Sequence, residues 1–169
     1  YATTNKNGIA TFENILIGEN YILKEVDTPK KYVVPSSKNA IVEWNKETGY
    51  TFKNILKKWR AEVSKIDSDF TEKSKTQGNA TLEGATYGVY KSGELMDTYT
   101  TDKKGKFVTK YYVCDDDWTI QEITPSEGYL LDSTVYKIDS EPSKYSIELN
   151  TERVSVYEDV IKSKIAIIK

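Results

Sequence analysis

An acidic residue stands on the apolar face of a predicted strand between Trp118 and Tyr129, and this feature limits the possible folds most. Trp118, Ile120 and Glu122 alternate with residues of the opposite face, which is the two-residue period of a β-strand. Thr124-Pro125 then predicts a turn. A glutamate is seldom fully buried unless it has a partner. The sequence therefore predicts a β-structure with a paired acid in its core.

The same arrangement occurs a second time near the N-terminus. Tyr21, Leu23 and Glu25 share one strand face ahead of another Thr-Pro turn. Glu25 and Glu122 are 97 residues apart. The same spacing relates two further pairs, namely Tyr32 with Tyr129 and residues 3–8 with residues 100–105. A fixed spacing of this kind indicates a repeated structural unit.

The repeat predicts an all-β chain of tandem β-sandwiches, each of roughly seven strands with Greek-key connections. No segment shows the period of an amphipathic helix. We expect residues 1–57 to be the C-terminal part of a first domain whose opening strands are missing. Residues 58–162 then form a complete domain, and residues 163–169 are the first strand of a following repeat.

Composition excludes several classes of function. The net charge of −2 gives no basic surface for nucleic acid or an anionic membrane. The single Cys114 excludes an internal disulfide, and the absence of histidine argues against zinc sites and histidine-based catalysis. Asp115–Asp117 is interpreted as a solvated loop, so neither a metal nor a cofactor is expected. No apolar run could span a membrane, and we expect a fragment without a signal or anchor.

Polar residues also end the apolar faces of the first and last strands of each unit. Lys65 follows Ala61 and Val63, and Lys169 stands in the same position after Ile165 and Ile167. The residues that stand 11 positions before these two lysines are Asn54 and Glu158. Glu158 therefore takes the place in the second unit that Asn54 has in the first.

A buried lysine, acid and asparagine can react with one another. Burial favours a neutral amine, which could attack the side-chain carbonyl of asparagine while a protonated glutamate shuttles protons. Ammonia would leave, and an amide would join the first strand to the last. Three simpler interpretations stay open: Glu25 and Glu122 cap turns, Lys65 is a snorkelling edge residue, and Asn54 ends a loop.

Four motifs carry a resemblance to a known family. They are Val63-x-Lys65-x-Asp67, the segment 82–87, Thr-Thr-Asp-x-x-Gly and Glu122-x-Thr-Pro-x-x-Gly-Tyr129. In this order they resemble the CnaB-type domains, also called SpaA-like or prealbumin-like, which are repeated modules of Gram-positive adhesins and pilins.

The resemblance implies a reverse Ig-like fold, an extracellular place on a cell-wall-anchored surface protein, and neighbouring repeats as partners. It also implies a Lys–Asn isopeptide bond whose formation an acid assists. In the second unit this site maps onto Lys65, with Glu122 as the proton shuttle. In the first unit it maps onto Asn54, with Glu25 as the shuttle.

Glu158 departs from the family pattern, since a glutamate is one methylene longer than the aspartate that replaces asparagine in some members. We therefore expect Lys65 to be unbonded and to form a buried ion pair with Glu122 or Glu158, one of the two acids holding a proton. We also expect that the tail of one molecule can add to the first unit of the next and bring Lys169 to Asn54.

The expected function is that of a structural stalk module, and the only chemistry expected is autocatalytic formation of the isopeptide bond. Two other functions stay open. One is a ligand-binding adhesin domain for a host extracellular protein or glycan, and the other is an accessory β module of a secreted carbohydrate-active enzyme. An exposed aromatic patch or a groove apart from the core would favour the adhesin.

Overall fold

The computed structural model describes residues 1–70, 72 and 74–168. The chain divides into two compact units. The first unit comprises Tyr1–Pro29 and Val34–Ile55, and the second comprises Lys30–Val33 and Leu56–Lys169. Apart from the single 3₁₀ turn η1 (Pro142–Lys144), the regular elements of the described residues are β-strands, so the all-β prediction is confirmed.

The first unit contains one antiparallel pair of strands. β1 (Gly18–Leu23) pairs with β3 (Lys38–Val42). A separate two-stranded ladder is formed by β2 (Tyr32–Val33), which belongs to the second unit, and β4 (Ile55–Leu56), which stands at the boundary between the units in the sequence. The sequence of residues 1–12 predicts a strand, a turn at residues 5–8 and a second strand. The turn is present, but no described residue before Gly18 lies in a strand, because the segments beside the turn do not pair with each other beyond it.

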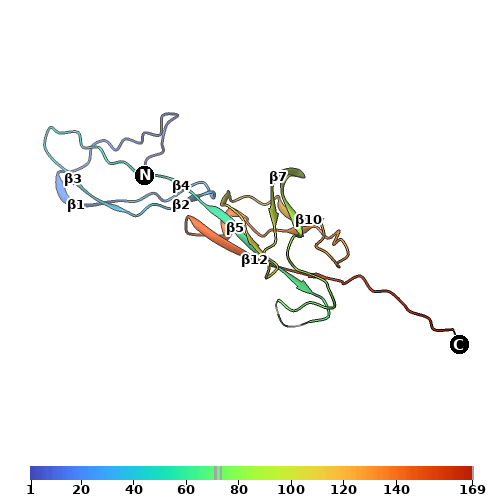
Figure 1. Ribbon diagram of the computed structural model, residues 1–169. Coiled ribbons are helices and arrows are strands. Elements are labelled where there is room, and N and C mark those ends of the chain that lie inside the picture. The colour runs from blue at the N-terminus through green and yellow to red at the C-terminus, as the bar shows by residue number, and fades with distance from the viewer. Residues whose placement is uncertain (71, 73, 169) are drawn as a thin grey trace. The chain divides into compact units, whose positions relative to one another are not determined.

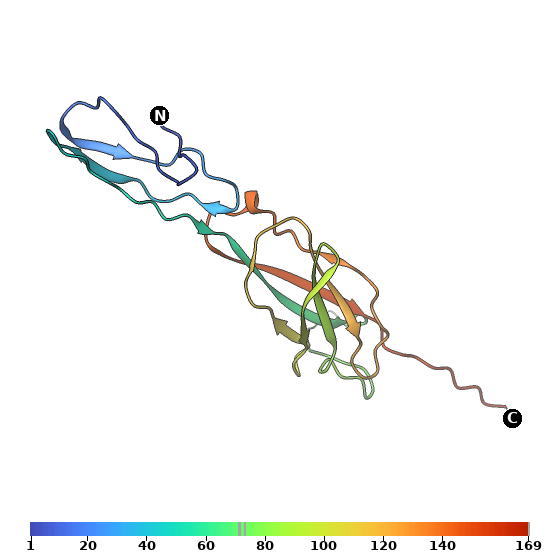
Figure 2. The ribbon, with the colours of Figure 1, turned by 90° about the horizontal axis from the view of Figure 1, so that it is seen from above.

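The second unit consists of two four-stranded sheets, and Figure 2 shows their strands as arrows. One sheet has the order β11-β10-β6-β7. The other has the order β12-β5-β8, with β9 also beside β5. The bounds are β5 (Lys58–Asp67), β6 (Thr86–Lys91), β7 (Glu94–Thr100), β8 (Lys106–Val108), β9 (Tyr112–Val113), β10 (Trp118–Thr124), β11 (Tyr136–Lys137) and β12 (Leu149–Glu158).

The first and last strands of this unit, β5 and β12, are parallel neighbours (Figure 1). Their register runs without a bulge from Lys58 opposite Leu149 to Asp67 opposite Glu158. Alternate residues of β5 are buried, as the apolar pattern Ala61-x-Val63-x-Lys65 predicts. A parallel pair needs a long crossover between its strands, and here the crossover contains the strands β6 to β11.

Aromatic rings fill the space between the two sheets. Trp59 of β5 lies 5.4 Å from both Tyr112 and Trp118, measured between ring centroids. Tyr87 of β6 packs on Phe107 of β8 at 5.3 Å. Rings of this size bury a large apolar area and prefer tilted or edge contacts. These ring contacts join β5 and β9 of one sheet to β10 of the other and so hold the two sheets together.

The segment after β12 leaves the sheets. Val160 still forms an isolated bridge to Tyr129, and Figure 2 shows the following residues running on as an extended trace. We expected residues 163–169 to form the first strand of another repeat. Residues 163–168 lie in no strand and are exposed, because a strand needs a neighbour for its backbone hydrogen bonds. Lys169 lies outside the described residues.

Candidate functional site

Lys65 is the centre of a cluster of charged side chains in the core of the second unit. β5 places its side chain on the same inward face as Ala61 and Val63, and the residue is 1% exposed. Its Nζ is in ion-pair contact with Oε2 of Glu158 and lies 3.4 Å from Oε1 of Glu122. The structure therefore brings together the three residues that the sequence predicted for this unit.

Glu158 reaches Lys65 because of the parallel pairing. It stands opposite Asp67 at the end of β12, while Lys65 stands opposite Val156. Glu158 and Lys65 are therefore diagonal neighbours on one face of the sheet. The other carboxylate oxygen, Oε1, accepts a hydrogen bond from the hydroxyl of Tyr87. Oε2 has no hydrogen-bond donor among the described residues besides the ammonium group that it faces.

Glu122 comes from the opposite sheet. It lies on β10 and is 3% exposed, on the apolar face predicted for it. Its Oε1 faces Lys65, and its Oε2 accepts a hydrogen bond from the backbone N–H of Asp132 at 2.9 Å. Lys65, Glu122 and Glu158 thus connect both sheets through a network of charge-assisted contacts.

A second layer of side chains holds the lysine in place. Nζ of Lys65 lies 4.4 Å above the ring of Tyr129, which is a cation–π distance. The hydroxyl of Tyr129 donates to Oδ2 of the fully buried Asp67 at 3.0 Å. Oδ1 of Asp67 accepts hydrogen bonds from the backbone of Asp69 and the side-chain amide of Gln77. Each polar group around the lysine is thereby fixed by a neighbour.

Burial decides the protonation of these groups. It lowers the pKa of Lys65 below the ordinary 10.5, while the negative charge of Glu122 acts in the opposite direction. The pKa of the Tyr87 hydroxyl is raised well above 10.0, first by burial and then by the charge of Glu122. Tyr87 therefore keeps its proton and remains a hydrogen-bond donor to Glu158.

The corresponding residues of the first unit meet as well. Nδ2 of Asn54 donates to Oε1 of Glu25 at 3.2 Å. Oε2 of Glu25 is buried and has no hydrogen-bond partner in the described part of the chain. Asn54 itself is exposed. The predicted acid and amide are thus together, but no described lysine forms an ion pair with Glu25.

Three members of the second-unit cluster were missed as participants. Tyr87, Asp67 and Tyr129 all stand in the motifs quoted above, yet the sequence assigned no role to any of them. Strand parity could have found the first two, because Tyr87 shares a face with Ala85 and Val89, and Asp67 shares a face with Lys65. Parity does not tell which of several inward residues a hydroxyl will reach.

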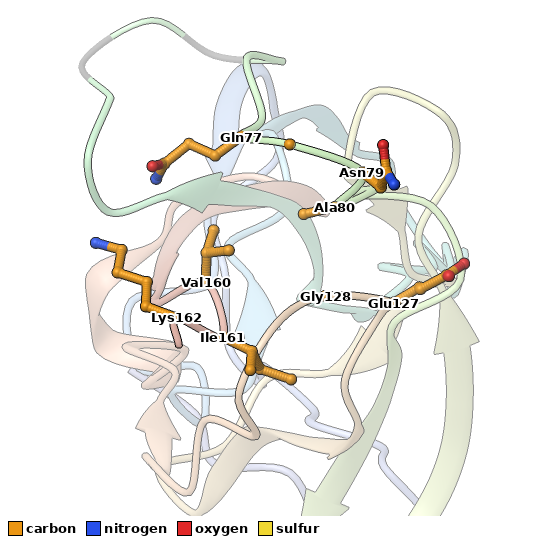
Figure 3. A pocket seen from close by; sticks show the side chains of 9 residues that line it. Gln77, Asn79, Ala80, Glu127, Gly128, Val160, Ile161 and Lys162 are labelled. Carbon is orange, nitrogen blue, oxygen red and sulfur yellow. The ribbon is translucent and has the colours of Figure 1, made fainter. Parts of the chain in front are cut away.

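A separate open cavity of about 360 Å³ lies at the end of the second unit (Figure 3). Its nine lining residues are Gln77, Gly78, Asn79, Ala80, Glu127, Gly128, Val160, Ile161 and Lys162. None of these is aromatic, and Lys162 already forms an ion pair with Asp69. The cavity contains no member of the Lys65 cluster.

The acidic loop could offer carboxylates to a cation. One carboxylate oxygen from each of Asp115, Asp116 and Asp117 lies within 4.8 Å of the others. Lys91 forms ion pairs with Asp115, at 2.9 Å, and with Asp117. Lys91 therefore offsets part of the negative charge of this loop.

Within the described residues, no helix is long and apolar enough to cross a membrane. Among curated proteins, none matches this chain. The sequence model of one family, the SpaA prealbumin-like fold domain, matches the chain twice, at residues 1–59 and at residues 60–154. The two matches are adjacent, as expected for a repeated unit.

Solved structures share the fold. The Bacillus anthracis TIE protein matches with a TM-score of 0.72 and 24% identity, over 95% of this chain and 28% of that one. The fimbrial protein FimP from Actonomyces oris matches with a TM-score of 0.51 and 16% identity, over 64% of this chain and 31% of that one. The chain spans less than a third of the length of either protein. At these identities the likeness is one of fold.

Proposed function

Because the chain belongs to the family of SpaA prealbumin-like fold domains, we propose that it is a structural stalk module of a Gram-positive cell-surface protein. It acts outside the cell among neighbouring repeats, and it turns over no external substrate. One observation carries this proposal: the buried Lys65 cluster joins the first strand of the second unit to the last.

The geometry of β5 and β12 suits a module under tension. Force along the chain enters the unit near Lys58, at the start of β5, and leaves near Glu158, at the end of β12. The two strands are parallel neighbours over ten residues, so pulling shears the whole ladder at once. Shear loads all the hydrogen bonds together, whereas peeling would break them singly. Lys65 and Glu158 add a charged contact across the same ladder.

We infer further that Lys65 is held by ion pairing and not by an amide. Glu158 stands where the family pattern has asparagine, so an amide would require water as the leaving group. Its two oxygens face Tyr87 and Lys65, an arrangement that suits an acceptor with two partners. A buried ion pair needs such additional hydrogen bonds to offset desolvation.

Intact-mass measurement of the full chain tests this inference. We expect the mass calculated from the sequence. A mass lower by one water molecule would mean that Nζ of Lys65 has bonded to the side-chain carbonyl carbon of Glu158. Such a bond would close a loop of some ninety residues and stabilise the unit by roughly 4–5 kcal/mol.

Single-molecule force spectroscopy of the full chain tests the mechanical role. We expect the second unit to unfold in one high-force event, and Lys65→Gln to lower that force clearly. Lys106→Gln is the control, because Lys106 is exposed on β8 and lies outside the cluster. Equal unfolding forces for Lys65→Gln and the unsubstituted chain would argue against the role.

A further inference from the structure

The two sheets of the second unit differ in the charge of their outer faces. On the sheet that contains β5 and β12, Glu62 forms ion pairs with Arg60 and with Arg153, both at 3.3 Å. On the sheet β11-β10-β6-β7, nine outward strand residues are uncharged, and we call them the neutral face. They are Thr86, Gly88 and Tyr90 of β6, Leu95, Thr98 and Thr100 of β7, and Thr119, Gln121 and Ile123 of β10.

This lack of charge is unusual for the chain. Charged residues make up 30% of the sequence, and the surface of a soluble domain ordinarily mixes charges of both signs. The neutral face meets a charge only at its edge, where Lys137 of β11 stands beside Thr119. An exposed face of this kind indicates contact with an uncharged ligand.

Tyr90 lies in the middle of the neutral face. Its ring leans along β6 over Gly88, since a Cβ added at Gly88 would lie 2.6 Å from Cε2 of that ring. Gly88 is buried beneath the ring, whereas Tyr90 is partly exposed. The hydroxyls of the inward Tyr87 and Tyr99 are hydrogen-bonded, but no described residue forms a hydrogen bond with the hydroxyl of Tyr90. The ring therefore rests on the backbone and turns one side to solvent.

Polar side chains flank this ring on both sides. Gln121 of β10 and Thr98 of β7 stand opposite Gly88, one on each side of β6. Neighbouring strands are about 4.8 Å apart, so an amide and a hydroxyl lie close to the two edges of the ring. Thr119 stands beside Tyr90 itself. Together these side chains offer hydrogen-bond donors and acceptors without any charge.

We propose that the neutral face binds a neutral glycan chain. The apolar face of one sugar ring stacks on Tyr90, and Gln121 and Thr98 form hydrogen bonds with the hydroxyl groups at its rim. A pyranose ring combines an apolar C–H face with uncharged hydroxyls, which is the combination that this surface matches. Protein interfaces depend on clusters of large buried anchors, and Tyr90 is the one aromatic residue of the neutral face.

This site goes beyond the stalk function and does not rest on the Lys65 cluster. Tyr87 and Glu122 belong to that cluster and alternate along their strands with Gly88 and Gln121. They therefore lie on the opposite side of the same sheet. The mass and force measurements on Lys65 and a measurement of glycan binding can fail independently of one another.

NMR titration of the isotope-labelled full chain tests the proposal. The neutral probes are cellohexaose, maltohexaose, mannohexaose and hexa-N-acetylchitohexaose. Each is added to about 10 mM, because one stacked ring with a few hydrogen bonds gives millimolar affinity. We expect at least one of them to shift the backbone amides of Gly88, Tyr90, Thr98 and Gln121. Hexagalacturonic acid is the charged comparator and should bind about tenfold more weakly than that probe.

Substitutions of Tyr90 separate stacking from simple coverage of Gly88. Tyr90→Leu should weaken binding about tenfold, because leucine keeps an apolar side chain there but cannot stack. Tyr90→Phe should keep the affinity within about threefold, since only the hydroxyl is lost. Tyr157→Ala is the matched control and should leave the affinity unchanged, because Tyr157 is 60% exposed on β12 of the other sheet.

Four outcomes would overturn the proposal: no shift with any of the four neutral probes, shifts that lie outside the neutral face, equal effects of Tyr90→Leu and Tyr157→Ala, or tighter binding of hexagalacturonic acid. A face that binds only a protein partner would give the first of these outcomes.

Discussion

The same turn occurs once in each unit, and its two copies have the same hydrogen bonds but different surroundings. In the first unit, Oδ1 of Asn5 accepts hydrogen bonds from the backbone N–H groups of Asn7 and Ile9. In the second, Oδ1 of Asp102 accepts from Lys104 and Lys106, the equivalent positions. The glycine that ends each turn has a positive φ, 75° at Gly8 and 71° at Gly105. Local sequence alone accounts for this turn.

What surrounds the turn depends on β5. The carbonyl of Gly105 accepts a hydrogen bond from the N–H of Lys65 at 2.8 Å, so the second turn is held against the first strand of its unit. Around Gly8, no described atom would lie within 4 Å of an added Cβ. The comparison shows that each turn is specified by its own residues. In the second unit, the partner strand β5 determines which side of the turn is buried.

The largest effect is expected in the second unit, where Lys65 lies between Glu122 and Glu158, and not in the first unit, where Glu25 and Asn54 have no lysine among the described residues. Lys65→Met should lower the free energy of unfolding of the second unit by about 3–5 kcal/mol, because two buried acids lose their cation. Urea unfolding followed by tryptophan fluorescence measures this. In a Trp44→Phe background the signal comes from Trp59 and Trp118 of the second unit.

Lys106→Met in the same background is the control for this change. Lys106 is exposed, so its substitution should alter the free energy of unfolding by less than about 0.5 kcal/mol. Similar values for the two variants would mean that the buried cluster contributes nothing to stability.

Substituting alanine for each of the two turn glycines tests the same positive φ in two surroundings. Gly105 lies against β5, whereas Gly8 has open space around it. Gly105→Ala should destabilise the second unit by about 3 kcal/mol, since its Cβ would lie 2.8 Å from the carbonyl oxygen of Lys65. Gly8→Ala has only the strain of positive φ, about 1 kcal/mol. Urea unfolding gives the first value and amide hydrogen exchange in β1 and β3 the second. Equal losses would contradict a role for β5 in confining the turn.

Alkaline pH tests the Tyr87 contact. Because the folded protein raises the pKa of Tyr87 above its unfolded value of 10.0, its contribution to stability is complete below pH 10.0 and is lost as the pH rises above it. Tyr87→Phe should cost about 1–2 kcal/mol at neutral pH through the lost hydrogen bond. Above pH 10.0 it should make the fall in stability shallower by about 1.4 kcal/mol per pH unit. Parallel pH profiles for the two proteins would refute this assignment.

The smallest effect is expected in the first unit. Asn54→Ala removes one exposed hydrogen bond to Glu25 and should change the opening free energy of β1 and β3 by less than about 1 kcal/mol. Amide hydrogen exchange measures this value. A loss as large as that of Lys65→Met would mean that the first unit already holds a complete cluster.

Much of the candidate site could be predicted because it follows from alternation and spacing. Parity placed Lys65, Glu122 and Glu158 on inward faces, and the 97-residue repeat identified Glu25 as the counterpart of Glu122. The strands expected on both sides of the first turn, within residues 1–12, are absent. Residues 163–168 lie in no strand either, and their assignment to a following repeat stays a prediction. A strand requires a neighbouring strand for its backbone hydrogen bonds, and the alternation of residues within a segment does not show whether such a neighbour is present.

The sequence by itself determined the turns, the β-strand period and the buried acids, because these depend on residues that are close along the chain. Only the tertiary structure decided that β5 and β12 pair in parallel, that Lys65 contacts both glutamates, and that Tyr87 donates to Glu158. These contacts join residues that are 57 to 93 positions apart in the sequence. The contacts of Lys65 with Glu122 and of Tyr87 with Glu158 form only when the two sheets have packed, since packing removes water from the charges.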